Sequence, residues 1–461
     1  MSKEHRLEAV HGKPTTHLDA IVIGGGVAGL AAASAVAERG SRVLVVEARP
    51  CLGGRAGSYT DPATREQVDN GQHILMGCYR ESFAFLRRIG ALSLVRVQPS
   101  LEVPAIDADG TYSVLSCPPL PSPWHLLGGI IEWDALAWRD RLSVLRLGPV
   151  IRTEQRRLAG RSARLAASPG ETVENWLIRN GQSQRLRDML WDPLALAALN
   201  QPPREAGASS FVRVLAEMFG PDPSAASIAF PAVPLDAMYA GPARRYIESR
   251  GGEVRTSALA HVLVEHGRAA GVRLRGGGEV RAAFVVSAVP WFALERLFDE
   301  VPEALAGIVS AAARMGSYPI VTVNLWLDRK VLAGPFVGLP GRSMQWAFDR
   351  SAITGGLSSH VSLVSSGAAG IVGQENEALV ALALRELRDA LPGARAATVR
   401  RASVVRERRA TFSLAPGQPA RPSTTTPLAG FYLAGDWTDT GLPGTIESAA
   451  VSGHLAAAAV R

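Results

Sequence analysis

The chain has 461 residues, 47% hydrophobic and 20% charged, so it can build two or three packed lobes and is not expected to be disordered. Its 49 basic and 42 acidic residues give a net charge of +7, which favours anionic partners, but no nucleic-acid-binding motif is present and we expect no nucleic-acid partner. The three cysteines, Cys51, Cys78 and Cys117, form no CxxC pair, so the sequence predicts neither a disulfide framework nor a metal site.

The first eighteen residues are polar and lack the apolar core of a secretory signal, so we expect an N-terminal tail on a cytoplasmic protein. The following stretch, 20–37, is uncharged over nearly the length that spans a bilayer, but glycines interrupt it early. It therefore predicts a buried strand at 19–23, a glycine turn and an Ala-rich helix at 27–39 that ends at Gly40. Residues 42–47 complete the unit as a second buried strand.

This strand–turn–helix–strand unit carries a dinucleotide-binding pattern. The glycines permit a tight turn and let the backbone approach a pyrophosphate, while the start of the helix offers free N–H groups. Glu47 ends the second strand, where a carboxylate accepts hydrogen bonds from a ribose hydroxyl. The residues expected to contact the dinucleotide here are Gly24, Gly26, Val27, Ala28, Gly29, Glu47, Ala48 and Arg49.

A second glycine pair follows shortly after the ribose-binding acid. Gly53-Gly54-Arg55 is typical of FAD-dependent oxidases and desaturases and not of NAD dehydrogenases. The glycines let a loop wrap the pyrophosphate, and the Arg55 guanidinium offsets its negative charge. The pattern therefore narrows the expected cofactor to FAD.

Residues 76–240 differ in composition from the N-terminal unit. A helix is expected at 81–89, followed by a Pro- and Trp-rich segment and then by an Arg-rich amphipathic stretch at 138–157 that Gly148-Pro149 is expected to break. Because residues 124–157 combine Trp, Leu and several Arg, we expect a helical portion at about 118–165 that faces a membrane; a solvated amphipathic helix is the alternative.

Beyond residue 240 the sequence returns to buried strands. Strands are expected at 260–264, 284–290, 320–326 and 431–436, with helices at 378–390 and 446–458. The end of the last strand carries a second FAD motif. Its cofactor-binding residues are expected to be Gly435 and Asp436, for the ribityl or pyrophosphate part, and Thr445 and Ile446, where the helix N-terminus points at the flavin ring.

This order predicts an α/β fold in which two lobes are interleaved. A Rossmann-like FAD-binding domain would comprise 19–75, 241–295 and 416–461. A mixed α+β substrate domain, which includes the helical portion, would comprise 76–240 and 296–415.

Several segments resemble those of the bacterial hydroxysqualene dehydroxylases, the squalene-associated FAD-dependent desaturase-like family. They run in order along the chain and leave out only the first eighteen residues; the most discriminating are Asp69-Asn-Gly-Gln-His73 and Trp191-Asp-Pro-Leu194. Asp192 is a mild departure, because the family often has Glu there. The other segments are 68–79 as a whole, 191–203, 319–328, 345–350 and 434–447.

The resemblance implies reductive removal of the hydroxyl of hydroxysqualene to give squalene, a precursor of hopanoids and other triterpenoids. Reduced FAD would deliver hydride from N5 to the allylic carbon, in a dry apolar tunnel, while the protein protonates the leaving oxygen. For the proton donor we favour His73, then Asp69, then Tyr79. The resemblance also implies cofactor contacts from Gly71, Gln72, His73 and Val262.

Tryptophans are candidates for the lining of the substrate tunnel. Trp437 is the strongest because it adjoins the Gly435-Asp436 motif; Trp among Leu and Ala is otherwise more often plain core. The candidates are Trp176, Trp191, Trp326, Trp346 and Trp437.

Two alternatives remain at this stage. A carotenoid (phytoene-type) desaturase would share the fold and a polyene substrate but run in the oxidative direction. A non-catalytic isoprenoid- or prenyl-protein-binding relative would reuse the fold, although the intact Gly53-Gly54-Arg55 argues against it. Amine oxidation is disfavoured because 320–323 lacks a lysine and Thr445 stands where an aromatic is expected. No separate NAD(P)H site is apparent, which makes another protein the candidate electron donor.

Overall fold

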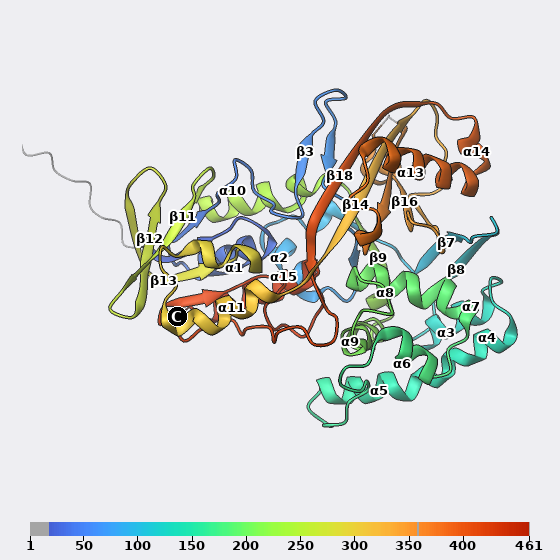
Figure 1. Cartoon of the computed structure of the whole chain (residues 1–461), viewed down its shortest axis with the longest axis horizontal. Helices are drawn as coiled ribbons and strands as arrows, with labels where there is room; N and C mark the ends of the chain where they lie inside the picture. The colour runs from blue at the N-terminus through green and yellow to red at the C-terminus, as the bar shows by residue number, and fades with distance from the viewer. Residues whose placement is uncertain (1–17, 357–358, 461) are drawn as a thin grey trace, which may run out of the picture.

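The computed structural model describes residues 18–356 and 359–460. In Figure 1 a first sheet lies at the left, a second sheet at the upper right, and a lobe of helices below the second sheet. The first sheet contains β1 (Leu18–Ile23), β2 (Val43–Val46), β10 (Glu253–Arg255), β11 (Ala260–Glu265), β12 (Arg268–Leu274), β13 (Glu279–Ser287) and β19 (Phe431–Leu433).

The strands β10, β2, β1, β13 and β19 run parallel, and β12 and β11 extend the sheet antiparallel. Successive side chains of β1 point to opposite faces of the sheet: Ala20 and Val22 enter one hydrophobic cluster, Ile21 and Ile23 another. A parallel sheet that is covered on both faces needs continuous apolar strands, which explains why residues 20–23 of β1 carry no charge.

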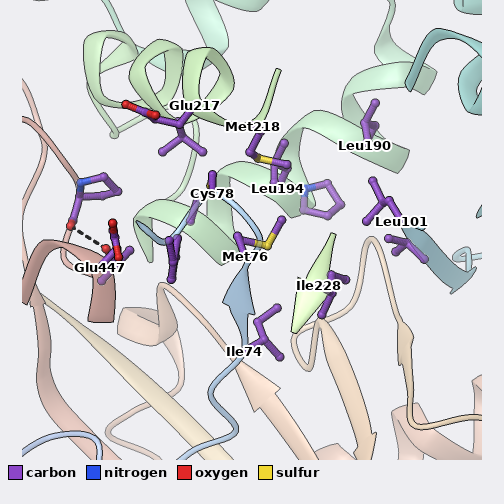
Figure 2. A pocket seen from close by; sticks show the side chains of 18 of the residues that line it. Ile74, Met76, Cys78, Leu101, Leu190, Leu194, Glu217, Met218, Ile228 and Glu447 are labelled. Atoms are coloured by element: carbon purple, nitrogen blue, oxygen red, sulfur yellow. Dashed lines mark hydrogen bonds between the residues drawn. The ribbon is translucent and has the colours of Figure 1, made fainter. Parts of the chain in front are cut away.

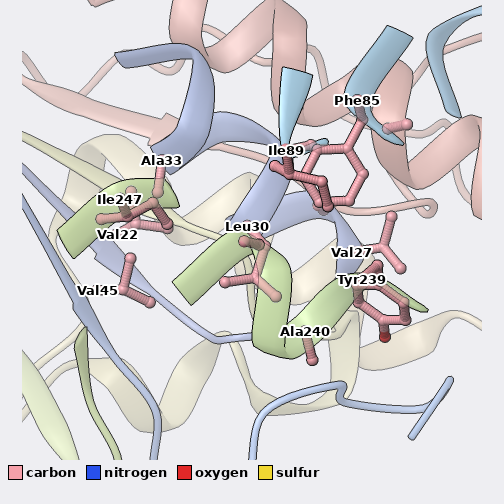
Figure 3. Close-up of a cluster of buried hydrophobic side chains, with 14 of the residues drawn as sticks. Val22, Val27, Leu30, Ala33, Val45, Phe85, Ile89, Tyr239, Ala240 and Ile247 are labelled. Carbon is pink, nitrogen blue, oxygen red and sulfur yellow. The ribbon is translucent and has the colours of Figure 1, made fainter. Parts of the chain in front are cut away.

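The two ends of the chain meet on one face of this sheet. Helix α1 (Val27–Glu38) packs against α15 (Ile446–Ala459), and a Cβ added at Gly453 of α15 would lie 2.4 Å from the Ala28 carbonyl oxygen of α1. Only a glycine allows the helices this close approach. Leu30 of α1, Val45 of β2 and Ile247 of α10 (Gly241–Ser249) belong to the cluster below them (Figure 3).

The second sheet mixes antiparallel pairs with one parallel pair, β15 with β7. On β14, Val321, Val323 and Leu325 pack into the hydrophobic cluster that includes helix α13 (Asn376–Ala390), so Thr322 and Asn324 between them face the other side. Its strands are β7 (Glu102–Ile106), β8 (Tyr112–Ser116), β14 (Ser317–Leu327), β15 (Phe336–Gly338), β16 (Trp346–Asp349), β17 (Ser359–Ser365) and β18 (Val399–Phe412).

The helical lobe has its own core, in which the Trp176 and Trp191 rings both meet Phe211 edge-on, at 6.3 and 6.4 Å between ring centroids. It comprises α3 (Trp124–Glu132), α4 (Trp138–Ser143), η2 (Val144–Arg146), α5 (Leu147–Leu158), α6 (Val173–Arg179), α7 (Gln184–Leu186), the π-helical turn η3 (Arg187–Trp191), α8 (Asp192–Leu199) and α9 (Ala208–Met218).

The remaining elements connect these parts. They are β3 (Ser58–Thr60), β4 (Gln67–Asp69), β5 (Leu75–Met76), β6 (Val95–Val97), β9 (Ile228–Pro231), α2 (Arg80–Arg88), α11 (Ala306–Arg314), α12 (Arg350–Thr354), α14 (Pro392–Arg395), the π-helical turn η5 (Asp236–Ala240), and the short turns η1 (Leu92–Leu94), η4 (Pro223–Ala226), η6 (Trp291–Ala293), η7 (Glu295–Leu297), η8 (Glu303–Leu305) and η9 (Ala368–Gly370).

The mixed α/β fold and the expected strand–turn–helix–strand unit are confirmed. The break expected at Gly148-Pro149 is wrong: both residues lie in the first turn of α5, where proline removes no N–H that the helix needs. The interruption falls earlier, at η2. Within the described ranges, no helix has both the length and the apolar character needed to cross a membrane.

Candidate active site

The glycine turn between β1 and α1 leaves the start of the helix open. Gly24 has φ +112°, and a Cβ there would lie 2.9 Å from the Ala288 carbonyl oxygen. A Cβ at Gly29 would lie only 1.9 Å from the Gly24 carbonyl oxygen, so α1 rests directly on the turn. The N-cap residue is Gly26, which has no side chain to cap the helix. The first N–H groups of α1 are therefore available to an anion.

The second glycine loop lies against the first. The Gly53 N–H donates to the Gly25 carbonyl oxygen at 2.9 Å, and a Cβ at Gly54 would lie 3.2 Å from the Gly26 Cα. A side chain at either facing glycine would occupy the space between the loops. Two bare backbones at a helix N-terminus form the cradle that a pyrophosphate needs.

Glu47 is buried at the end of β2, beside the turn. Its Oε2 accepts a hydrogen bond from the Gly25 N–H at 2.7 Å, and its Oε1 accepts one from the Arg49 N–H at 2.9 Å. Each carboxylate oxygen has a second lone pair, which is available for a ribose hydroxyl. Ala48 and Arg49 are exposed just beyond the strand.

The C-terminal motif meets the N-terminal one through an ion pair. Arg55 pairs with the buried Asp436, donates to the Ala410 carbonyl oxygen at 2.8 Å, and lies over the Trp291 ring at 5.5 Å. The Gly435 N–H donates to Ser452 Oγ at 2.8 Å, which fixes the motif on α15. A cationic side chain, a glycine cradle and an open helix N-terminus together fit FAD.

The first residues of α15 complete this part of the site. Thr445 caps the helix by accepting a hydrogen bond from the Ser448 N–H at 3.1 Å, and Ile446 begins it. The Glu447 carboxylate accepts hydrogen bonds from the Glu81 and Ser82 N–H groups at 2.9 and 2.8 Å, so it caps α2. Burial raises the pKa of Glu447. Sequence reasoning missed this capping role, which depends on a residue 366 positions away.

The Asp69-to-His73 segment is held by a buried arginine. Asp69 pairs with Arg350 of α12 at 2.7 Å, and the other carboxylate oxygen of Asp69 accepts hydrogen bonds from Ser58 Oγ at 2.7 Å and from the Leu235 N–H at 3.0 Å. Arg350 also donates to Gln72. Asp69 is thus fully engaged, which argues against its role as a proton donor. Arg350 was missed as a site residue, although it ends the 345–350 segment.

His73 lies in the same segment with one ring nitrogen committed. Its Nδ1 lies 2.9 Å from the Gly71 carbonyl oxygen, which only accepts, so Nδ1 carries the hydrogen. Burial lowers the pKa of His73, with the Arg350 cation acting in the same direction against the opposing effects of Gly71 and Asp69. Neutral His73 then has a bare Nε2, which accepts and does not donate. Val262 is a buried core residue of β11.

A largely apolar cavity of about 400 Å³ lies between the second sheet, the helical lobe and the start of α15. In Figure 2, Glu217 and Glu447 lie on one side, whereas Leu101 and Leu190 lie on the other. Arg213 neutralises Glu217 through a 2.7 Å ion pair. A cavity that is apolar along most of its lining and polar on one side suits an elongated hydrocarbon with one polar group.

Tyr79 is the one of the three expected catalytic residues that lines this cavity. Thr445, the N-cap residue of α15, also lines the cavity. Burial raises the pKa of Tyr79, so its phenol keeps its proton at physiological pH and remains a donor.

Of the expected tunnel tryptophans, Trp346 lines the cavity, and Trp133 does so without having been expected. The other expected tryptophans, Trp176, Trp191, Trp326 and Trp437, are not among the residues that line this cavity. Each is fixed elsewhere through its indole N–H: Trp191 by Gln182 at 3.0 Å, Trp326 by Glu66 at 2.8 Å and Trp437 by the Val289 carbonyl oxygen at 3.0 Å. Trp176 is likewise bonded to the Ala166 carbonyl oxygen at 3.0 Å.

The dinucleotide cradle, the paired motifs from both chain ends and the adjoining apolar cavity define an FAD-dependent oxidoreductase. Residues 27–461 match the family described as flavin containing amine oxidoreductase. The chain therefore belongs to the flavin-containing amine oxidoreductases, in the same family as the hydroxysqualene dehydroxylases.

Hydroxysqualene dehydroxylase from Rhodopseudomonas palustris is 30% identical over 95% of this chain and 96% of its own length, and that from Sinorhizobium fredii is 28% identical over 95% and 96%. The 15-cis-phytoene desaturase of Synechococcus elongatus is 24% identical over 95% of both chains. A crystal structure of an oxidoreductase from Methanosarcina mazei has the same fold, with a TM-score of 0.71 at 17% identity over 95% of this chain and 99% of that one.

Proposed function

We propose that this protein converts hydroxysqualene to squalene by FAD-dependent reductive dehydroxylation. The observation that carries the proposal is the apolar cavity, which adjoins the start of α15 and has the Tyr79 phenol in its wall. Full-length similarity to two hydroxysqualene dehydroxylases supports the choice of substrate.

The reaction replaces a hydroxyl by a hydrogen. The carbon–oxygen bond breaks, the oxygen takes up a proton and leaves as water, and a hydride forms the new carbon–hydrogen bond. Reduced FAD supplies the hydride when bound. The chain itself must bind the hydrocarbon, exclude bulk water and supply the proton.

We assign the proton donation to Tyr79. Tyr79 lines the cavity, and its phenol keeps its proton. The Nε2 of neutral His73 carries no hydrogen, and the Asp69 carboxylate is paired with Arg350. His73 then serves as a hydrogen-bond acceptor, through Nε2, in the same segment as Gly71 and Gln72. The motifs carry the assignments to the cofactor of Gly24, Gly26, Val27, Ala28, Gly29, Glu47, Ala48, Arg49, Gly53, Gly54, Arg55, Gly435, Asp436, Thr445 and Ile446. The assignments of Gly71, Gln72 and Val262 rest on the family resemblance alone.

We propose the domain division along the same lines. The strands of the first sheet come from 19–75, 241–295 and 416–461, apart from the first residue of β1, and those of the second sheet come from 76–240 and 296–415. The cofactor would belong to the first group and the hydrocarbon to the second.

A paired-substrate experiment tests the function. The reduced enzyme receives hydroxysqualene and the oxidised enzyme receives phytoene, with products separated by chromatography. Squalene from the first reaction and unchanged phytoene in the second are expected. The converse result would make the protein a desaturase, in agreement with its more distant similarity to the phytoene desaturases.

We further propose that the helical lobe contacts the inner face of an anionic membrane. Its exposed apolar face consists of large hydrophobic side chains on α3, α4 and η2 and on the segment just before α3. The helix α4 packs on both α3 and η2. Trp124 and Trp138 are 62% and 65% exposed. The face comprises Leu120, Trp124, Ile131, Trp138, Leu142 and Leu145. Residues 118–165 contain eight arginines and four acidic residues, which suits anionic lipid headgroups.

The position of α3 explains how such a face would serve the reaction. Trp124 and Ile131 point outwards, Leu126 and Ile130 are buried, and Trp133, directly after the helix, lines the cavity. One short helix thus separates the exposed apolar face from the space proposed for a membrane-soluble substrate.

Vesicle sedimentation tests this contact. The double variant Trp124→Ser/Trp138→Ser should lose most binding to vesicles that contain anionic phospholipid, while Val264→Ser, which removes an exposed side chain of β11, should bind like the unchanged protein. Equal binding by the double variant would refute the assignment of this face.

A further inference from the structure

A π-helical turn directs a buried tyrosine at the cofactor loop. The turn η5 precedes α10, and π-turns of this kind recur at functional sites. Its Tyr239 is 1% exposed and meets the Phe85 ring edge-on at 6.4 Å between centroids. In Figure 3 the Tyr239 ring lies beside Val27 at the start of α1, and its hydroxyl points away from Phe85.

The Tyr239 hydroxyl reaches the loop that faces the glycine turn. Its oxygen lies 2.7 Å from the carbonyl oxygens of both Gly53 and Ala56. Burial raises the pKa of Tyr239, so the phenol keeps its proton throughout the physiological range and always acts as the donor. The two carbonyls bracket Gly54 and Arg55, the residues assigned to the cofactor.

Peptide geometry gives this contact a consequence for the cofactor. The C=O and N–H of a trans peptide point in opposite directions, so holding the Gly53 carbonyl at Tyr239 turns the Gly54 N–H to the other side. Within the described residues, neither the Gly54 N–H nor the Arg55 N–H has a protein acceptor. Both are therefore left for an anionic ligand.

A second set of bonds fixes the start of the same turn to β3 and β4, the strands that follow the loop. The Asp236 N–H donates to Ser58 Oγ at 3.2 Å, and Ser58 Oγ donates to Asp69 at 2.7 Å. Asp69 also accepts from the Leu235 N–H at 3.0 Å and pairs with Arg350. Tyr239 is thus held in place relative to the loop, and its hydroxyl has a defined position.

We propose that Tyr239 is a positioning residue for FAD. It holds the Gly53–Ala56 loop so that the Gly54 N–H faces the pyrophosphate, and the neighbouring Arg55 N–H stays available to the same ligand. The inference rests on the assignment of this loop to FAD. It does not depend on the substrate, because flavin retention is measured without turnover.

Tyr239→Phe removes the hydroxyl and keeps the packing of the ring. The buried Ala56 carbonyl oxygen then has no donor, and the Gly53 carbonyl oxygen keeps only the Ala56 N–H at 3.2 Å. This loss weakens the binding loop, and we expect the dissociation constant for FAD to rise about tenfold or more. Holoenzyme is diluted and flavin release is followed by the recovery of flavin fluorescence. The matched control is Tyr246→Phe on α10, whose ring contacts Arg250 and whose hydroxyl makes no hydrogen bond to the cofactor loop.

A purely structural role would lower thermal stability of the apo protein without changing the affinity for FAD. Unchanged affinity in folded Tyr239→Phe would therefore overturn the proposal. Should this variant not fold, amide hydrogen exchange of the unchanged apo protein decides. The Ala56 amide should exchange more slowly than the amides of the exposed turn Gly276–Gly278, and equal rates would overturn the proposal.

Discussion

Replacing Gly29 by alanine tests the cradle most sharply, because the added methyl group has no space. Its Cβ would lie 1.9 Å from the Gly24 carbonyl oxygen, about 1.1 Å short of the closest contact that Cβ atoms show. The turn must therefore retreat, and overpacking of this kind costs about 1–3 kcal/mol. The same movement displaces the Gly24 carbonyl and with it the glycine turn, whose N–H groups would bind the pyrophosphate.

Gly307→Ala is the matched control. Gly307 also lies in a helix, α11, but nothing lies within 4 Å of its added Cβ, so alanine should stabilise the helix by about 0.5–1 kcal/mol. Both variants are purified, and their ratio of flavin to protein absorbance and their denaturant-unfolding midpoints are compared. Gly29→Ala should have lost most flavin and Gly307→Ala none. Full flavin content in Gly29→Ala would refute the proposed position of the cofactor.

Three further outcomes are expected from the site and its surroundings. Arg350→Met should lower the free energy of unfolding by about 3–5 kcal/mol because Asp69 remains buried without its partner, and the added change Asp69→Asn should recover part of it in denaturant titrations. Arg401 lowers the pKa of Asp61 to about 2, so the stability that this pair contributes should be complete above pH 3.8 and disappear as the pH falls through about 2; unfolding curves of Asp61→Asn should lack this change. Tyr79→Phe should retain FAD but slow single-turnover dehydroxylation about 100-fold or more, and an unchanged rate would exclude it as the donor.

The cofactor site was predictable because its signals are local. Gly24, Gly29 and Glu47 lie within one strand–turn–helix–strand unit, whose geometry follows from apolar strands and a glycine turn. The Gly435 motif repeats that logic at the other end of the chain. The sequence predicted that both motifs bind one cofactor, and the pairing of Arg55 with Asp436 now joins them directly.

The contacts that support the site were not predictable in the same way. Tyr239 and Arg350 act across 186 and 281 positions, and nothing adjacent to either residue marks its partner. Tryptophans show the same limitation. Trp191 and Trp437 are as apolar and aromatic as Trp346, and only the packing around each decides whether it faces a core or a cavity.

The central claim is reductive removal of a hydroxyl by the bound flavin, and an anaerobic single turnover tests it directly. Photoreduced enzyme is mixed with hydroxysqualene while the flavin spectrum is recorded, and the lipid products are then quantified. Oxidised flavin should return with one squalene formed per flavin. A flavin that stays reduced, or that reoxidises without squalene, would contradict the proposed function.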